Sequence, residues 1–275
     1  MEDLFFHNLE ISDADFKRMV DFIQKEYGID LSKKRQLIAS RLAHSLRELG
    51  YQDFHSFLEH LLSQKDSSDI ELIINKLTTN YTFFLREQEH FTFLRDTVLP
   101  ELVRRHQRDR VLSIWSAGCS SGEEPYTISM YLKDFFGSDA SNWDTRVLAT
   151  DISQQALSKA REGVFKRPVD MSPEWVKRYF TPDKEPGLYA VKPLIKDNVI
   201  FRTYNLMDPI RFRLKFDVIF CRNVMIYFNS ETRDALIKRF YDAMLPSAYL
   251  FISHSESLGQ SPLFRMVAPA VYQKR

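Results

Sequence analysis

The sequence lacks the features that mark several classes of protein. Two cysteines, Cys119 and Cys221, are too few for a disulfide framework and do not have the spacing of metal ligands, so we expect reduced thiols and no metal site. No run approaches the roughly 18 apolar residues of a membrane span, and the first residues are acidic where a secretion signal needs positive charge. We therefore expect a soluble, cytoplasmic protein that does not insert into a membrane.

The chain also lacks an excess of charge of either sign. Its 38 Lys and Arg residues face 37 Asp and Glu residues, which gives a formal net charge of +1. Such a chain has no overall field that attracts a polyanion, so nucleic acid is disfavoured as the main partner. The length of 275 residues lies between one and two domains, at about 150 residues per domain.

The first part of the chain has the periodicity of helices. Ser12 and Asp15 resemble a capping box, and Gly50 has the position of a residue that ends a helix. Apolar residues recur at helical spacing on two stripes, which are Phe16, Met19, Val20, Ile23 and Tyr27, and then Leu31, Ile38, Leu42, Leu46 and Leu49. Residues 51–62 and 69–77 continue the same period. This region is predicted to form a small helical bundle.

From residue 110 onward, short apolar runs alternate with longer amphipathic segments. The runs have strand length and are rich in Val, Ile and Phe; they cover residues 110–116, 145–151, 198–204, 216–222 and 248–255. Helices are expected between them at 124–136, 153–162 and 230–245. This alternation predicts a doubly wound, mainly parallel α/β sheet, with closing strands in 262–275. Prolines interrupt it in 163–197, which indicates an insertion.

A glycine turn follows the first predicted strand. Gly118 and Gly122 precede a helix, but the turn ends in Glu123 and Glu124 where a phosphate-binding loop would carry a lysine. Asp151, at the end of the second strand, has the position of a carboxylate that binds ribose hydroxyls, yet it lies further on than the roughly 20 residues of the NAD fingerprint. The ligand therefore resembles a nucleoside with a positive amine. S-adenosylmethionine fits, with Glu124 beside its amine and backbone N–H groups at its carboxylate.

Each of these residues also has a purely structural explanation. Ser121 and Glu124 fit a capping box, and Asp151 could cap the helix that follows it. The combination favours a site, because polar groups fall at the carboxyl ends of four predicted strands, where sheets of this kind bind ligands. These groups are Gly118 with its neighbours, Asp151, Asn205, and Cys221 with Arg222 and Asn223.

Several segments together resemble one family. Residues 80–91, 114–130, 149–153, 204–206 and 216–228 are similar, in order, to the motifs of the CheR family, the chemotaxis receptor glutamate O-methyltransferases. The resemblance implies a helical substrate-recognition domain over 1–85 and a Rossmann-like, S-adenosylmethionine-binding catalytic domain over 86–275. It also implies that the insertion at about 163–197 is a small antiparallel subdomain.

The resemblance implies roles for individual residues. Arg86 and Tyr227 match the positions proposed to lie against the methyl group and the substrate carboxylate. The positions that surround the cofactor are matched by Asn80, Thr82, Arg86, Gly118, Glu124, Asp151, Asn205, Leu206, Cys221 and Arg222. Taken without the resemblance, residues 80–87 could be an ordinary helix start capped by Thr79, Asn80 or Thr82, with Phe83 and Phe84 in the core. Tyr227 could be a buried aromatic.

The substrates implied are methyl-accepting chemoreceptors, in chemotaxis adaptation or a related signalling array. Lys34, Arg41 and His44 share one face of the second predicted helix and are expected to meet the cytoplasmic helical bundle of the receptor. Residues 179–202 lack the glycine-pair loop associated with members that bind a receptor C-terminal peptide, so we expect no such requirement. The enzyme is expected to be a monomer.

Two other functions remain open from the residues. One is methylation of a nucleic acid or small molecule, although the segment "CRNVMIY" differs from the N/D-P-P-Y stretch of enzymes that methylate exocyclic amines of bases. The other is a catalytically silent, cofactor-sensing scaffold, against which the presence of Arg86 and Tyr227 argues.

Overall fold

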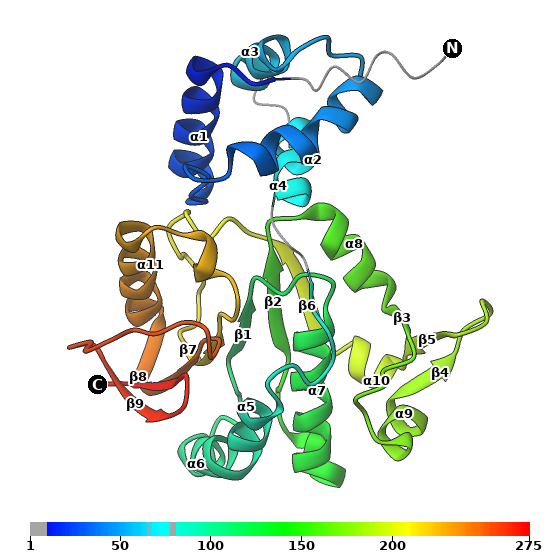
Figure 1. Cartoon of the computed structure of the whole chain (residues 1–275). Helices are drawn as coiled ribbons and strands as arrows, with labels where there is room; N and C mark the ends of the chain where they lie inside the picture. Colours follow the sequence, from blue (N-terminus) through cyan, green and yellow to red (C-terminus); the bar gives the residue numbers. More distant parts are fainter. Residues whose placement is uncertain (1–9, 65–66, 78–80) are drawn as a thin grey trace. The chain divides into compact units, whose positions relative to one another are not determined.

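The structure is a computed structural model that describes residues 10–64, 67–77 and 81–275. The chain divides into two compact units (Figure 1). The first contains Met1–Thr79 together with Tyr227–Thr232, and the second contains Asn80–Ile226 and Arg233–Arg275. No helix among the described residues is long and apolar enough to cross a membrane.

The first unit is the predicted helical bundle. Its helices are α1 (Asp13–Tyr27), α2 (Arg35–Glu48), α3 (Phe54–Gln64) and α4 (Ser67–Leu77). Ser12 caps α1 by accepting the N–H of Asp15, and Gly28 ends it with a φ of 72°. Burial of the two apolar stripes, through residues such as Met19, Ile23, Leu42 and Leu46, forms its core together with Phe57 from α3.

Two details of the second helix differ from expectation. The helix begins at Arg35, so Leu31 lies before it and Lys34 is its N-cap residue. Leu49, expected on the apolar stripe, is 56% exposed. It occupies the C-cap position next to Gly50, whose φ of 86° turns the chain away from the helical path. The apolar period therefore ends one turn earlier than the leucine pattern suggests.

A short segment from late in the sequence belongs to the helical unit. The N–H of Asp30 donates to the carbonyl of Tyr227 over 2.8 Å, and Ile29 forms an antiparallel bridge with Phe228. The rings of Tyr227 and Phe228 pack against the core of this unit. The ammonium of Lys34 lies 5.7 Å from the centre of the Tyr227 ring.

The second unit is built on a seven-stranded sheet in the order β6-β2-β1-β7-β8-β10-β9. The pairs from β6 to β8 are parallel, and β10 and β9 add antiparallel strands at one edge. The strands are β1 (Ile114–Ala117), β2 (Val147–Asp151), β6 (Val199–Thr203), β7 (Phe216–Phe220), β8 (Met244–Phe251), β9 (Phe264–Ala268) and β10 (Val271–Lys274). The doubly wound architecture and the closing strands are confirmed, although β1 starts later than residue 110.

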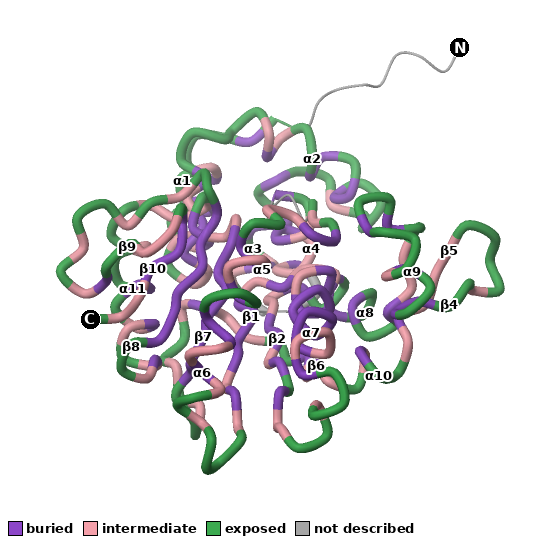
Figure 2. The backbone as a smooth tube through the Cα atoms, turned by 90° about the horizontal axis from the view of Figure 1, so that it is seen from below, coloured by how far each residue is buried: buried purple, intermediate pink, exposed green. Residues whose placement is uncertain are grey.

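Helices cover both faces of this sheet. The central strands β1 and β7 are buried along their whole length (Figure 2). On one face Phe220 stacks on Phe91, and on the other Trp115 packs against Phe240. The helices are α5 (Gln88–Phe93), the π-helix η1 (Leu94–Val98), α6 (Leu99–Arg105), α7 (Glu123–Phe136), α8 (Gln154–Glu162) and α11 (Ser230–Ala243), with short 3-10 turns η2 (Gly137–Asn142) and η3 (Met225–Tyr227).

The proline-containing insertion is a small antiparallel subdomain. Its strands β3 (Val164–Lys166), β4 (Phe180–Pro182) and β5 (Leu188–Val191) have the order β3-β5-β4. Helices α9 (Pro173–Tyr179) and α10 (Pro193–Lys196) complete it, and each begins with a proline, where the missing N–H costs no hydrogen bond. This confirms the antiparallel insertion.

Candidate functional site

The glycine turn lies at the carboxyl end of β1. Because β1, β2 and β7 are parallel neighbours, their carboxyl ends lie at the same edge of the sheet. Asp151 is the last residue of β2, and Gly118 and Cys221 directly follow β1 and β7. Gly118 has a φ of 82°, and a Cβ there would lie 2.4 Å from Cγ2 of Val224. Gly122 has a φ of 99°, and a Cβ there would lie 2.9 Å from that of Ala160. Only glycine fits both positions.

Asp151 ties this turn to the neighbouring strand. Its carboxylate accepts the N–H of Ser120 over 2.7 Å and the N–H of Ser153 over 2.9 Å. Burial raises the pKa of Asp151, and the backbone N–H groups oppose that rise. Asp151 does not itself cap the next helix, because Ser153 is the N-cap of α8 and accepts the N–H of Ala156.

Glu124 points from the first turn of α7 into a polar network. Its carboxylate accepts the hydroxyl of Ser116 over 2.7 Å and lies 3.1 Å from Nη1 of Arg222. Burial raises its pKa, and the charge of Arg222 opposes the rise. The proposed capping box with Ser121 is wrong, because the N-cap of α7 is Gly122, which makes no side-chain cap hydrogen bond. Ser121 instead donates to Glu123.

Residues 81–87 cross the site without forming a helix. The alternative of an ordinary helix start is wrong, because α5 begins at Gln88. Phe84 is buried against the antiparallel insertion as expected, but Phe83 is 37% exposed. The guanidinium of Arg86 lies 5.8 Å from the centre of the Phe83 ring and donates to the Tyr81 carbonyl over 2.9 Å. Thr82 is half-buried. Asn80 and Thr79 lie outside the described residues.

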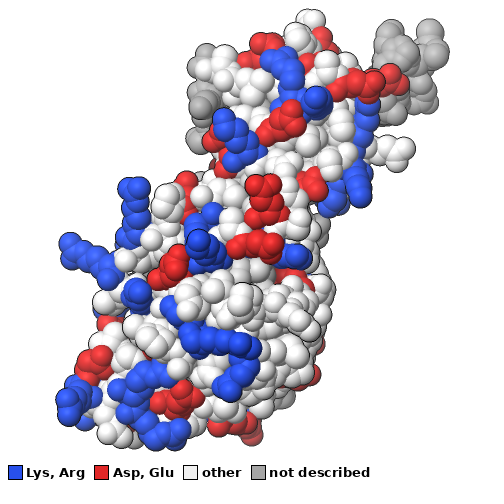
Figure 3. Space-filling model, turned by 90° about the vertical axis from the view of Figure 1, so that its left-hand side faces the viewer, with Lys and Arg blue, Asp and Glu red and all other residues white. Residues whose placement is uncertain are grey.

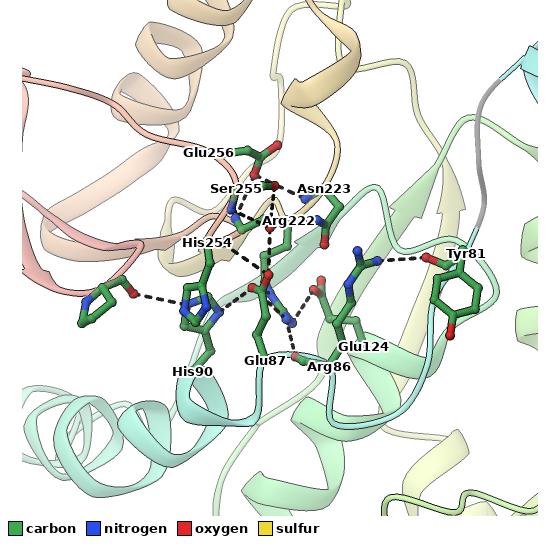
Figure 4. A network of polar contacts seen from close by, with 12 residues as sticks. Tyr81, Arg86, Glu87, His90, Glu124, Arg222, Asn223, His254, Ser255 and Glu256 are labelled. Carbon is green, nitrogen blue, oxygen red and sulfur yellow. Dashed lines mark hydrogen bonds and ion pairs between the residues drawn. The ribbon is translucent and has the colours of Figure 1, made fainter.

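Arg222 is the centre of a buried network (Figure 4). Its Nε and Nη2 atoms each lie 3.2 Å from Oε2 of Glu87, while Nη1 bonds Glu124. Nη2 also donates to the backbone carbonyl of Arg86, and the guanidinium lies 5.3 Å from the Phe91 ring centre. This network holds the segment that carries Arg86 to the end of β7.

Sequence reasoning missed Glu87, which connects three parts of the site. Besides Arg222, its carboxylate accepts the hydroxyl of Ser253 over 2.8 Å and the N–H of His254 over 3.3 Å (Figure 4). The charge of Arg222 and these hydrogen bonds hold the pKa of Glu87 below its usual value, although burial acts in the opposite direction and is the largest single effect. Its position next to Arg86, in a segment that resembles the family motif, is the sequence feature that could have identified Glu87 as a site residue.

Three other residues predicted to surround the cofactor follow β6 and β7, namely Asn205, Leu206 and Cys221. The side chain of Asn205, after β6, accepts the N–H of Met207 over 2.9 Å, and Leu206 is buried. Both cysteines are free and buried, and burial raises the pKa of each thiol. Cys221 has no exposed surface and donates its N–H to Phe251.

The remaining candidates belong to the helical unit. Tyr227 groups with that unit rather than with Arg86. Lys34, Arg41 and His44 are all exposed on or beside α2. Arg41 donates to the Lys76 carbonyl over 3.1 Å, and His44 lies 3.3 Å from Glu48. On the face drawn in Figure 3, basic and acidic side chains are interspersed, as the net charge of +1 suggests.

The strand ends fit a ligand with both donor and acceptor groups. The side-chain oxygen of Asn223 is buried without a hydrogen-bond partner among the described residues. The N-cap of α7, Gly122, has no side chain to cap the first N–H groups of that helix. Asp151 at the end of β2 and Glu124 in the first turn of α7 supply carboxylates. An amino acid joined to a nucleoside has the complementary groups.

Comparison with known families identifies the family of this chain. A family model described as "CheR methyltransferase, SAM binding domain" matches residues 80–272, and "CheR methyltransferase, all-alpha domain" matches 14–78. The chain belongs to the CheR methyltransferase family. Its cofactor is therefore S-adenosylmethionine, and the predicted family, cofactor and fold class are confirmed.

Curated relatives extend the comparison over nearly the whole chain. The chain is 39% identical to the "Chemotaxis protein methyltransferase" of Borreliella burgdorferi, over 97% of this chain and 96% of the relative. It is 38% identical to the protein of the same name in Escherichia coli, over 90% of this chain and 86% of the relative. The solved structure of PKMT2 from Rickettsia typhi in complex with AdoHcy is 15% identical, with a TM-score of 0.33, over 51% of this chain and 20% of that one.

Proposed function

We propose that this enzyme transfers the methyl group of S-adenosylmethionine to glutamate side chains of methyl-accepting chemoreceptors, forming glutamyl methyl esters. The observation that carries the proposal is the match of both CheR-family domains, supported by relatives that are named chemotaxis protein methyltransferases. The same relatives argue against nucleic acid as substrate and against a silent scaffold. The reaction would take place in the cytoplasm, where the receptor bundle lies.

The cofactor would be held at the strand ends. Asp151 would accept ribose hydroxyls and Glu124 would face the amine, while the first N–H groups of α7 would bind the carboxylate. The positive φ of Gly118 allows the backbone to approach closely. Thr82, Asn205, Leu206, Cys221 and Arg222 would complete the surroundings, with Asn80 as a further candidate. Because the Arg222 guanidinium is already engaged, its contribution would be to position Glu124 and the Arg86 segment.

The chemistry requires alignment rather than proton transfer. When bound, S-adenosylmethionine supplies a methyl group on a sulfonium, which a carboxylate can attack directly. A glutamate with an unperturbed pKa near 4.3 is already ionised at neutral pH, so no general base is needed. Positioning the reacting groups is worth up to roughly 7 to 11 kcal/mol where alignment is good.

Arg86 is the proposed orienter of the substrate carboxylate. The Tyr81 carbonyl and the Phe83 ring fix its guanidinium, and that carbonyl takes only one of its five N–H donors among the contacts of the described residues. A tight bidentate pair would hold the nucleophile but also weaken it, so we infer a single orienting hydrogen bond.

Tyr227 is proposed to assist at the substrate carboxylate through its hydroxyl. Replacing Tyr227 with phenylalanine should lower the methyl-transfer rate at saturating substrates by about tenfold while cofactor affinity changes little, because the ring packing is retained. Single-turnover kinetics and calorimetry measure the two quantities. A normal rate would remove Tyr227 from the site.

Receptor recognition is proposed to rest on the basic surface beside α2. Changing Lys34 and Arg41 to glutamate should raise the KM for receptor at least tenfold with little effect on cofactor binding, because both side chains are exposed and the receptor methylation region is acidic. Added salt should weaken the wild-type interaction in the same direction, since exposed charges are screened beyond about 8 Å at physiological ionic strength.

A matched control keeps this experiment specific. Reversal of Lys17 and Lys25 on α1 makes the same change of charge on a different helix and should leave the KM for receptor unchanged. If both double reversals raise the KM for receptor equally, the overall charge of the protein, and not docking on α2, determines receptor binding. Loss of methylation on deletion of the receptor C-terminal tail would contradict the proposal that no tail peptide is needed.

A further inference from the structure

Three potential metal ligands converge beside the proposed cofactor site. Glu87 and His90 come from the start of α5, and His254 comes from the loop after β8 (Figure 4). One nitrogen or oxygen atom from each side chain lies within 4.8 Å of the other two. Nδ1 of His90 is 3.4 Å from Oε2 of Glu87, and the two imidazole ring centres are 4.7 Å apart.

His90 is not satisfied by the protein alone. Its Nε2 atom lies 3.3 Å from the Pro269 carbonyl, which can only accept, so Nε2 carries the proton of a neutral ring. Nδ1 then presents a lone pair toward a carboxylate oxygen. The residue is 1% exposed, and Nδ1 has no hydrogen-bond partner among the described residues. A lone pair and a carboxylate that face each other in a buried place favour a cation between them.

We propose that Glu87, His90 and His254 form a binding site for a divalent transition-metal ion of the zinc class. Two imidazoles and one carboxylate form a ligand set that zinc accepts. A separation of 3.4 Å between Nδ1 and Oε2 suits two ligands that each lie about 2.0 to 2.2 Å from one ion. Glu-x-x-His spacing places two ligands together, and His254 is exposed, so its ring can rotate toward the ion.

The ion would compete with Arg222. The same Oε2 atom of Glu87 bonds Nε and Nη2 of Arg222, so the carboxylate cannot serve both cations fully. Binding of the metal would therefore loosen Arg222, which also bonds Glu124 and the Arg86 carbonyl. Because those groups belong to the proposed cofactor surroundings, the metal and the cofactor should weaken each other's binding by the same factor. The site would make the enzyme sensitive to inhibition by zinc.

The test is titration of the full-length, metal-free protein with zinc chloride by calorimetry, and with cobalt chloride by visible absorption. We expect one ion per chain and a cobalt spectrum of nitrogen and oxygen ligation. His254→Ala should weaken zinc binding at least tenfold, whereas His44→Ala, which removes an exposed histidine outside the cluster, should not. Glu87→Gln should weaken zinc binding as well, and it retains the shape of the side chain.

Binding of S-adenosylhomocysteine measures the coupling. At a fixed zinc concentration that nearly saturates the wild-type site, zinc should weaken it several-fold in the wild type and in His44→Ala, and should have a much smaller effect in His254→Ala. Absence of a single zinc site, or undiminished zinc affinity in both His254→Ala and Glu87→Gln, would overturn the site. Tight zinc binding that leaves the affinity for S-adenosylhomocysteine unchanged would overturn the competition with Arg222.

Discussion

Replacing Arg86 with alanine should lower the rate of methyl transfer by about 100-fold at saturating cofactor and receptor, with a much smaller loss of cofactor affinity. The change removes the donor proposed to orient the substrate carboxylate, and misplacement of a reacting group by about 1 Å can cost that factor. The backbone carbonyl that bonds Arg222 remains, so the buried network is retained. Single-turnover methylation of receptor fragments and calorimetry with S-adenosylhomocysteine give the two quantities.

Two further variants make this prediction specific. Arg86→Lys keeps the charge but loses the planar fork, and should recover only part of the rate. Arg95→Ala removes another arginine, which pairs with Asp96 on the surface, and should leave the rate unchanged. If Arg86→Ala instead weakens cofactor binding and turns over normally at saturation, Arg86 is a cofactor ligand and not the orienter.

The sheet and the position of the glycine turn could be predicted because their signals are local. Strand-length runs at 145–151 and 216–222 contain β2 and β7, and parallel strands place their carboxyl ends along one edge. The turn needed glycine for a reason that sequence only suggests: the side chains of Val224 and Ala160, far along the chain, leave no room for a Cβ. The same topology also explains why the carboxylates of Glu124 and Asp151 lie at this edge of the sheet.

The buried ion network could not be predicted, because its members meet only through tertiary packing. Glu87 and Arg222 are far apart in sequence, and each resembles an ordinary charged residue. The left-handed backbone at Glu87, with a φ of 54°, also has no local signal. Tyr227 follows β7 in sequence, yet its backbone bonds Asp30 in the helical unit. That pairing depends on a partner about two hundred residues earlier in the printed sequence.

Replacing Asp151 with asparagine should weaken S-adenosylmethionine binding by roughly 10- to 150-fold, which corresponds to the loss of a charge-assisted hydrogen bond of about 1.5 to 3 kcal/mol. The structure makes asparagine the better choice over alanine, because the carboxylate also accepts the N–H groups of Ser120 and Ser153. Alanine would leave both donors without that partner and loosen the glycine turn, so lost affinity could reflect lost structure. Asparagine retains one acceptor oxygen, which can serve one of these two N–H groups.

The raised pKa of Asp151 predicts how its replacement should affect the stability of the protein. Because burial raises this pKa above its unfolded value, the contribution of Asp151 to stability is fully present below the unfolded pKa and is lost as pH rises through the folded pKa. At neutral pH the ionised side chain thus carries a cost that a neutral amide does not. Asp151→Asn should therefore lower the Tm less than Asp151→Ala, which removes both acceptor oxygens, while both variants lose cofactor affinity. Near-normal affinity in a folded Asp151→Asn protein would show that Asp151 supports the turn but does not bind the ribose.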